Sequence, residues 1–158
     1  MYKTRFLVQA AVIAAIYVVL TLVFAPISYG ETLIEFRISE ALTVLPFFTT
    51  AAIPGLFVGC MIANIFSPVG AIDVVVGSLA SLLSAYLTYK MPSKYLAPLP
   101  PVVVNALVIG GLLHYVYKFP ILMSILSIGL GQLATCYGIG MVLIFTLEKY
   151  KKQDLFPF

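Results

Sequence analysis

Apolar residues run almost unbroken through most of the chain, interrupted by short stretches that carry charges, prolines and glycines. Apolar runs of about 18 residues or more are typical of membrane-spanning helices. The pattern predicts helices over 5–25, 39–49, 54–66, 71–89, 102–117 and 120–148. It therefore predicts an all-α integral membrane protein: a compact six-helix transmembrane bundle that forms one membrane-embedded domain over 1–158.

The second and third predicted helices are short and interrupted by proline. Pro46 lies inside the second, and Pro54 opens the third, where a first-turn proline is favourable. Each would span roughly 20 Å at about 1.5 Å per residue, less than the ~30 Å hydrocarbon core. They are either kinked helices packed between the others or a re-entrant pair. Short segments broken by proline often mark a binding site in membrane transporters.

The composition supports a membrane protein and excludes several other classes. The chain is 62% hydrophobic and 9% charged, with a mean hydropathy of +1.10, whereas soluble domains carry about 25% charged residues. No basic face suits a nucleic acid polymer. The chain has one histidine and no cysteine spacing typical of metal sites, so we expect no metal and no cofactor. It lacks catalytic motifs and an ATP-binding motif, which argues against an enzyme.

The basic residues are distributed unevenly between the two predicted ends of the bundle. Seven of the nine fall at the end that holds both termini: Lys3, Arg5, Lys90, Lys94, Lys149, Lys151 and Lys152. Only Arg37 and Lys118 fall at the other end. Because basic residues concentrate in cytoplasmic loops, the sequence predicts a multi-pass protein of the cell membrane with N- and C-termini in the cytoplasm.

Three ionisable residues stand in apolar surroundings: Arg37, Glu40 and Asp73. An ionisable group inside a membrane is costly and is by default a candidate functional residue. Arg37 and Glu40 are spaced i, i+3, so on a helix they could form an ion pair. The structural alternatives are a helix-start ion pair for Arg37 and Glu40, and a favourable position near a helix N-terminus for Asp73.

Three amide side chains, Asn64, Asn105 and Gln132, lie within apolar helices. Such amides often form hydrogen bonds between helices. Their predicted depths also allow convergence, with Asn64, Glu40 and Asp73 in the outer half and Asn105 and Gln132 near the middle. Together they would line a cavity that opens outward, with the last two amides as its floor.

The first predicted helix carries two pairs of alanines four residues apart, Ala10 with Ala14 and Ala11 with Ala15. Small residues at this spacing let another helix approach closely. The sequence alone leaves open whether they pack inside the bundle or dock against another membrane subunit.

The stretch FRISEALTVLPFFT, followed by AAIPGLFVGCMIANIFSPVG and DVVVGSLASLL, closely resembles the queuosine-precursor transporter family. That family comprises substrate-binding (S) components of energy-coupling factor (ECF) transporters. The resemblance implies a six-helix membrane protein that captures a 7-deazaguanine outside the cell. It also implies that the protein acts in a complex with a transmembrane coupling subunit and two ATPase subunits. The resemblance favours a docking role for Ala11 and Ala15.

The chemistry of a 7-deazaguanine suggests roles for the polar residues. The base presents a ring N–H and an amino group beside a carbonyl, and a carboxylate accepts paired donors well. An aminomethyl arm would add a cation that needs a second carboxylate. Glu40 and Asp73 could divide these roles, with an amide completing the edge, Arg37 holding Glu40, and Phe36 or Tyr137 stacking. A different vitamin-like ligand, an intramembrane enzyme and a ligand-free accessory subunit are the alternatives.

Overall fold

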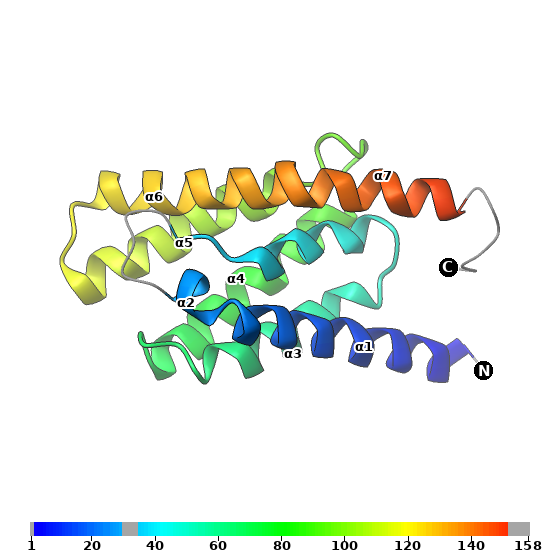
Figure 1. Cartoon of the computed structure of the whole chain (residues 1–158), viewed down its shortest axis with the longest axis horizontal. Helices are drawn as coiled ribbons and strands as arrows, with labels where there is room; N and C mark the ends of the chain where they lie inside the picture. Colours follow the sequence, from blue (N-terminus) through cyan, green and yellow to red (C-terminus); the bar gives the residue numbers. More distant parts are fainter. Residues whose placement is uncertain (1, 30–34, 152–158) are drawn as a thin grey trace.

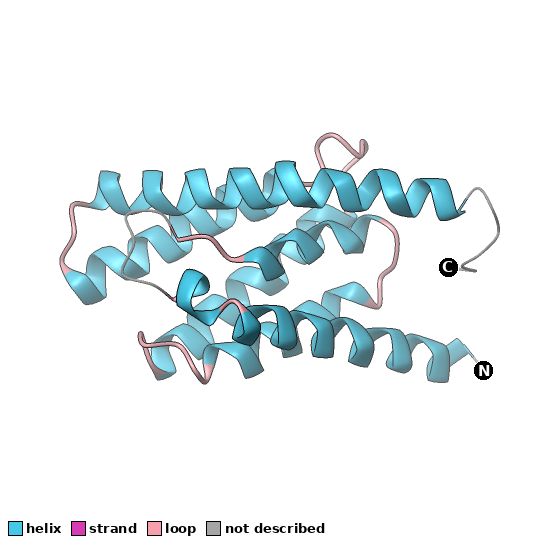
Figure 2. Cartoon of the chain, viewed as in Figure 1, coloured by secondary structure: helices cyan, strands magenta, loops and turns pink. Residues whose placement is uncertain are grey.

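The computed structural model describes residues 2–29 and 35–151, and this part of the chain contains helices and loops but no strand (Figure 2). The helices in chain order are α1 (Tyr2–Val23), α2 (Ala25–Ser28), η1 (Ile38–Phe47), α3 (Ala52–Asn64), α4 (Ala71–Tyr89), α5 (Leu99–Tyr117), α6 (Ile121–Leu133), η2 (Ala134–Ile139) and α7 (Gly140–Lys151). The prediction of an all-α architecture is confirmed.

Four helices in the described residues are long and apolar enough to cross a membrane. They are Lys3–Val23, Ala71–Tyr89, Leu99–Tyr117 and Ile121–Tyr150, the last a continuous rod made of α6, η2 and α7. Two further apolar helices, Ile38–Phe47 and Ala52–Asn64, are shorter. The protein is therefore a multi-pass membrane protein whose short helices lie where the sequence predicted them.

Two helix boundaries differ from the prediction because prolines lie inside first turns. Helix α5 begins at Leu99 rather than near 102, with Pro100 and Pro101 in its first turn. The stretch after α1, predicted as a loop, forms the single turn α2 with Pro26 near its start. The first backbone N–H groups of a helix have no intrahelical acceptor, so a proline there costs no hydrogen bond.

The element η1 is wound as a 3₁₀ helix over its ten residues, where the sequence predicted an ordinary helix. A 3₁₀ helix rises about 2.0 Å per residue, and runs beyond three or four residues are uncommon outside hinges or strained segments. Pro46 lies near its end. The rod contains a second irregular segment, η2, which is π-helical and packs against η1. Wide-turn segments of this kind are frequent at functional sites.

Helices α1 and α3 pack closely through the small residues of both. A side chain at Gly55 would come within 2.8 Å of the Ala10 carbonyl oxygen, and one at Gly59 within 3.0 Å of the Ala14 carbonyl oxygen. Lipid gives helices no hydrophobic drive to associate, so close backbone contact of this kind stabilises the pair. The alanines of α1 therefore fall on two faces: Ala14 is buried against α3, whereas Ala11 and Ala15 are exposed.

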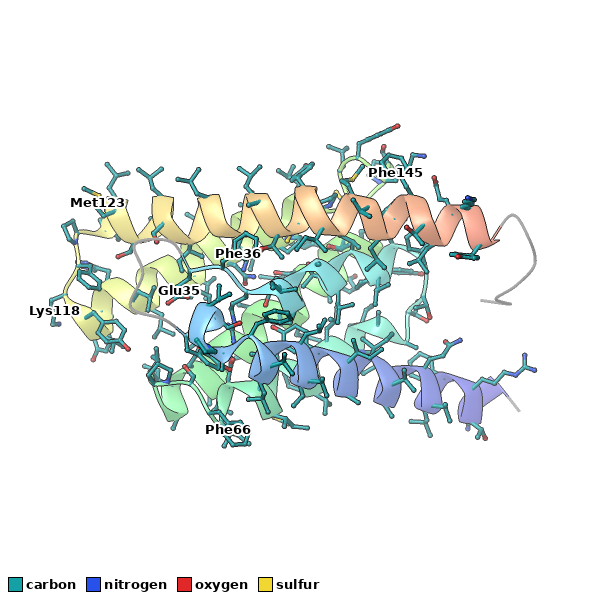
Figure 3. The ribbon with its side chains drawn as sticks, viewed as in Figure 1. Glu35, Phe36, Phe66, Lys118, Met123 and Phe145 are labelled. Carbon is teal, nitrogen blue, oxygen red and sulfur yellow. The ribbon has the colours of Figure 1, made fainter. Side chains whose placement is uncertain are left out.

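The start of α1 and the end of α7 lie at the same end of the bundle, on the right of Figure 1. The loop between α4 and α5 reaches that end as well, because Lys94 forms an ion pair of 2.7 Å with Glu148 of α7. Lys94 also lies over the rings of Tyr95 and Phe145, and Figure 3 shows Phe145 at this end. The arrangement agrees with the even number of crossings that the sequence predicted.

Gly55→Ala should destabilise the protein, because the new methyl group would collide with backbone of α1 rather than with a flexible side chain. Overpacking of this kind costs about 1–3 kcal/mol. Gly111→Ala is the matched control, since nothing lies within 4 Å of its would-be Cβ and alanine favours a helix by about 1 kcal/mol over glycine. Thermal unfolding in detergent measures the melting temperatures of both variants. Equal melting temperatures for the two variants would contradict the packing described for α1 and α3.

Candidate functional site

Glu40, in the first turn of η1, is 1% exposed and is held by two other helices. The Tyr17 hydroxyl of α1 donates to Glu40 Oε1 at 2.5 Å, and Asn105 Nδ2 of α5 donates to Oε2 at 3.1 Å. A carboxylate has about four acceptor positions. Each oxygen of Glu40 therefore retains capacity for a further donor, and the carboxylate borders a small cavity.

Arg37 directly precedes η1 and is extended rather than helical, with φ −96° and ψ 99°. Its Nη2 donates to Asn64 Oδ1 at 2.5 Å, and its guanidinium lies 5.4 Å from the centre of the Tyr29 ring. Within the described residues it forms no ion pair, and its buried Nε has no hydrogen-bond partner. The predicted contact between Arg37 and Glu40 is therefore wrong, because the i, i+3 spacing joins side chains only when both residues are helical.

Asn64, at the end of α3, connects Arg37 to the start of α4. Its amide nitrogen donates to the backbone carbonyl of Asp73 at 3.0 Å, and the Asp73 side chain is 5% exposed. Gly77 makes this arrangement possible, because a Cβ there would lie 2.7 Å from Asp73 Oδ1 and closer still to the Asn64 amide nitrogen. Any other residue at 77 would force these two polar side chains to move.

The larger of two neighbouring cavities has a volume of about 690 Å³. Its polar and charged lining comprises Ser28, Tyr29, Glu35, Arg37, Ser67, Asp73, Tyr117, Ser124 and Ser127. Other lining residues include Phe119 and Met123, next to the turn that joins α5 to α6. Figure 3 shows Met123 and Lys118 at the end of the bundle opposite Phe145. This cavity therefore lies away from the two chain ends, within the 300–1,000 Å³ range of small-molecule sites.

The smaller cavity lies nearer the middle of the bundle and measures about 10 Å³, roughly the space that one water molecule requires. Its lining comprises Glu35, Arg37, Glu40, Gly77, Ser81, Asn105, Ile109, Ile128 and Gln132. Glu35, Arg37 and Ile109 line both cavities. The two cavities are thus neighbours that share one wall, and the shared wall carries one carboxylate and one guanidinium.

The structure brings most of the predicted site residues together. The small cavity is lined by the predicted residues Arg37, Glu40, Asn105 and Gln132. The large cavity is lined by Arg37 and Asp73. The two amides Asn105 and Gln132 both line the smaller cavity.

The remaining predicted residues lie outside both linings. Asn64 is fully buried and acts on the site through Arg37 and Asp73. Phe36, labelled in Figure 3, and Tyr137 are half-buried and line neither cavity. The structure therefore provides no contact between these two rings and either cavity.

Sequence reasoning missed several residues of the site, among them Tyr17, Glu35 and Gly77. Tyr17 has a signal, since a tyrosine in the middle of an apolar helix needs a partner for its hydroxyl. Glu35 lies between the first two predicted helices, where the sequence gives no sign of a site residue, but it borders both cavities. Burial raises the pKa of its carboxyl, and the nearby Arg37 partly offsets this rise. Gly77 has no local signal, because its role depends on α3 lying against α4.

Comparisons with known proteins agree with the family resemblance seen in the sequence. The QueT transporter family matches residues 7–149. A queuosine precursor transporter QueT from Lactococcus lactis subsp. cremoris (strain MG1363) is 42% identical over 83 residues, which cover 51% of this chain and 47% of that protein. No solved structure matches the chain.

The chain thus aligns with about half the length of this curated relative. The family and the relative are both named as transporters, so the prediction that the protein is not an enzyme is confirmed. Because the family match extends over most of the chain, including every residue of the two cavity linings, the protein belongs to the QueT transporter family.

Proposed function

We propose that the protein is the substrate-binding component of an ECF-type importer and captures a queuosine precursor with a 7-deazaguanine base outside the cell. Family membership and the name of the Lactococcus relative support the substrate class. The observation that carries the proposal is Glu40, a carboxylate buried in the bundle beside a cavity, whose side-chain partners in the described residues are neutral. Such a group is costly in a membrane and is typical of a ligand site.

The residues around Glu40 complement the edge of a guanine-like base. The base offers a ring N–H and an amino group, which the Glu40 carboxylate accepts, beside a carbonyl that needs a donor. Arg37 supplies a donor, since its Nε is buried without a partner among the described residues. The Gln132 side chain lines the same cavity and can both donate and accept. Charge-assisted hydrogen bonds of this type are the strong ones.

A base cannot fit the small cavity in the structure described here, because about 10 Å³ accommodates only a water molecule. The base therefore enters the large cavity first. Its edge reaches Glu40 when the side chains of the shared wall, Glu35 and Arg37, move aside. Binding in this scheme exchanges the contact between Arg37 and Asn64 for contacts with the ligand.

Uptake requires an energy source outside this chain, whose sequence has no ATP-binding motif. We assign this role to a coupling subunit and two ATPase subunits, the partners that the ECF class implies. The exposed alanines Ala11 and Ala15 provide a smooth strip on α1 for docking, since the inward-facing Ala10 and Ala14 already pack against α3. Small residues at this spacing suit close approach of a second helix in lipid.

The orientation follows from the positive charges. Described basic residues gather at the end that holds the start of α1 and the end of α7, including Lys94 paired with Glu148; Lys152 lies outside the described residues. Cytoplasmic loops are enriched in lysine and arginine. We therefore place this end in the cytoplasm, so that the large cavity faces outward.

Glu40→Gln tests the recognition site. The variant keeps the shape of the side chain but replaces one acceptor by a donor that opposes the donors of the base. Hydrogen bonds to charged groups are worth about 1.5–3 kcal/mol, so affinity should fall roughly ten- to a hundredfold. Titration calorimetry of the purified, monodisperse protein with a 7-deazaguanine measures it. Glu148→Gln, at the opposite end, is the control. Unchanged affinity in Glu40→Gln would remove Glu40 from recognition, and no binding by the unmodified protein would refute the proposed function.

Ala15→Trp tests docking. A bulky ring on the exposed strip should abolish uptake by cells that contain the complete transporter, while the isolated protein still binds its ligand. Val142→Trp, on the exposed face of α7, is the control and should leave uptake within about twofold, since exposed positions tolerate substitution. Normal uptake with Ala15→Trp would exclude docking through this strip, and loss of folding would show a packing role instead.

Single cysteines at Lys90 and Lys118, both exposed, test the orientation. A thiol reagent that cannot cross membranes should label residue 118 on intact cells and label residue 90 only after the cells are opened. Cys60 and Cys136 are buried, so the unmodified protein provides the blank. The opposite labelling pattern would invert the topology.

A further inference from the structure

The turn between α5 and α6 forms part of the rim of the large cavity. Its contribution to the lining comprises Tyr117, Phe119, Pro120 and Met123. All four residues also reach the molecular surface, whereas Asp73 of the same lining is buried. Figure 3 shows Lys118 and Met123 at the end of the bundle where this turn lies. Side chains that border both the cavity and the surface lie at its entrance, so the position of this turn affects how a ligand enters and leaves.

The backbone of this turn is strained at Lys118, which has φ 60° and ψ 20°. Among the described residues it is the only residue other than glycine with a positive φ. The left-handed conformation is unfavourable for a residue with a side chain, because Cβ lies too close to the following carbonyl oxygen. The Lys118 N–H donates to the His114 carbonyl oxygen at 3.0 Å and so caps α5. Strained backbone of this kind persists only where surrounding contacts impose it, and it is frequent at ligand sites.

The side chain of His114, in the last turn of α5, supplies such a contact. Its Nδ1 donates to the carbonyl oxygen of Phe119 at 2.5 Å. A carbonyl oxygen can only accept, so Nδ1 must carry a hydrogen. The bond closes the chain around Lys118 by joining α5 to the residue that follows the strained position. It therefore fixes the backbone on which the Tyr117 and Phe119 rings stand, whose centres are 6.0 Å apart.

The other side of the turn is fixed by α6. The backbone N–H of Ser124 donates to the Pro120 carbonyl oxygen at 3.0 Å, and the Ser124 hydroxyl donates to the same oxygen at 3.3 Å. These bonds belong to the first turn of α6 and come after Phe119 in the chain. The two sides of the turn thus have separate supports, and the bond from His114 supports the side that carries the two rings.

We propose that His114 is a positioning residue for ligand binding: its bond to the Phe119 carbonyl holds Tyr117 and Phe119 in the rim of the large cavity and so slows the escape of a bound ligand. The inference rests on the proposed function, in which a ligand enters through this cavity. His114 lines neither cavity, so it acts through the turn rather than by touching the ligand.

Loss of this bond should change the rate of ligand exit more than the rate of entry. Without it, Lys118 can relax toward a conformation that suits a lysine, and the two rings leave the rim. Among variants of one binding site, differences in affinity come mostly from the dissociation rate. One net hydrogen bond corresponds to a change of roughly two- to tenfold, so the expected effect on dissociation is of this size.

The dissociation rate of radiolabelled 7-aminomethyl-7-deazaguanine from the purified full chain, chased with unlabelled base, tests the inference. His114→Phe keeps a ring but has no donor, and dissociation should become roughly two- to tenfold faster. His114→Asn should restore the rate to within about twofold, because its amide N–H, like Nδ1–H, is carried on a nitrogen bonded to Cγ and can donate to the same carbonyl. Unfolded molecules hold no ligand, so the rate reports only on folded protein and separates positioning from a general loss of stability.

Tyr115→Leu is the matched control. It removes the ring beneath the Lys118 ammonium, 5.1 Å away, but leaves the bond to Phe119, and the dissociation rate should stay within about twofold, as for most exposed positions. Equal acceleration in Tyr115→Leu and His114→Phe, or in His114→Asn and His114→Phe, would overturn the role of the hydrogen bond.

The remaining outcomes separate this inference from the proposed function. An unchanged dissociation rate in His114→Phe overturns the positioning role and leaves the proposed function standing. Failure of the unmodified protein to bind the base overturns the proposed function and this inference with it. Should His114→Phe fail to fold, His114→Leu, which also lacks the donor, decides the matter by the same comparison.

Discussion

The structure depends on the need to surround a buried carboxylate with hydrogen-bond donors. Glu40 is 1% exposed, and its two oxygens are met by Tyr17 of α1 and Asn105 of α5. These bonds fix how α1, η1 and α5 meet. Lipid is as apolar as leucine, so hydrophobicity alone gives membrane helices no preferred register. Specific polar contacts and close backbone packing provide it instead.

Helix α1 takes part in both proposed activities, ligand binding at Glu40 and docking to the coupling subunit. One face packs against α3 through Gly55 and Gly59, and from the same buried side Tyr17 reaches Glu40. The other face presents Ala11 and Ala15 outside the bundle. A second bond, from Thr21 to Ser39, also links α1 to η1. Any ligand that competes with Tyr17 for Glu40 therefore acts directly on the helix that carries the proposed docking strip.

The sequence was sufficient to predict the helices, the membrane class and most of the polar lining. Long apolar runs are a strong signal, and isolated polar residues in them are few, so Glu40, Asp73, Asn105 and Gln132 were readily identified. The features that the sequence could not predict depend on contacts between segments that are distant in the chain. The extended backbone of Arg37 keeps its side chain from pairing with Glu40, and no local pattern in the sequence predicts this conformation or the 3₁₀ winding of η1.

Two further residues show the same limit. Gly77 is required because Asn64 and Asp73 occupy the space of a side chain, which is known only once α3 lies against α4. Glu35 follows a polar stretch that is typical of a solvent-facing loop, yet it lines both cavities because the chain turns inward before η1. Figure 3 shows Glu35 between α1 and the long helix that contains α6.

The most direct test of the account is a structure of the protein with a bound 7-deazaguanine. The account predicts the ring N–H and amino group within about 3 Å of the Glu40 carboxylate, the usual hydrogen-bond range, and Arg37 turned from Asn64 toward the carbonyl. A base bound elsewhere, with the contacts of Glu40 to Tyr17 and Asn105 and of Arg37 to Asn64 unchanged, would contradict it.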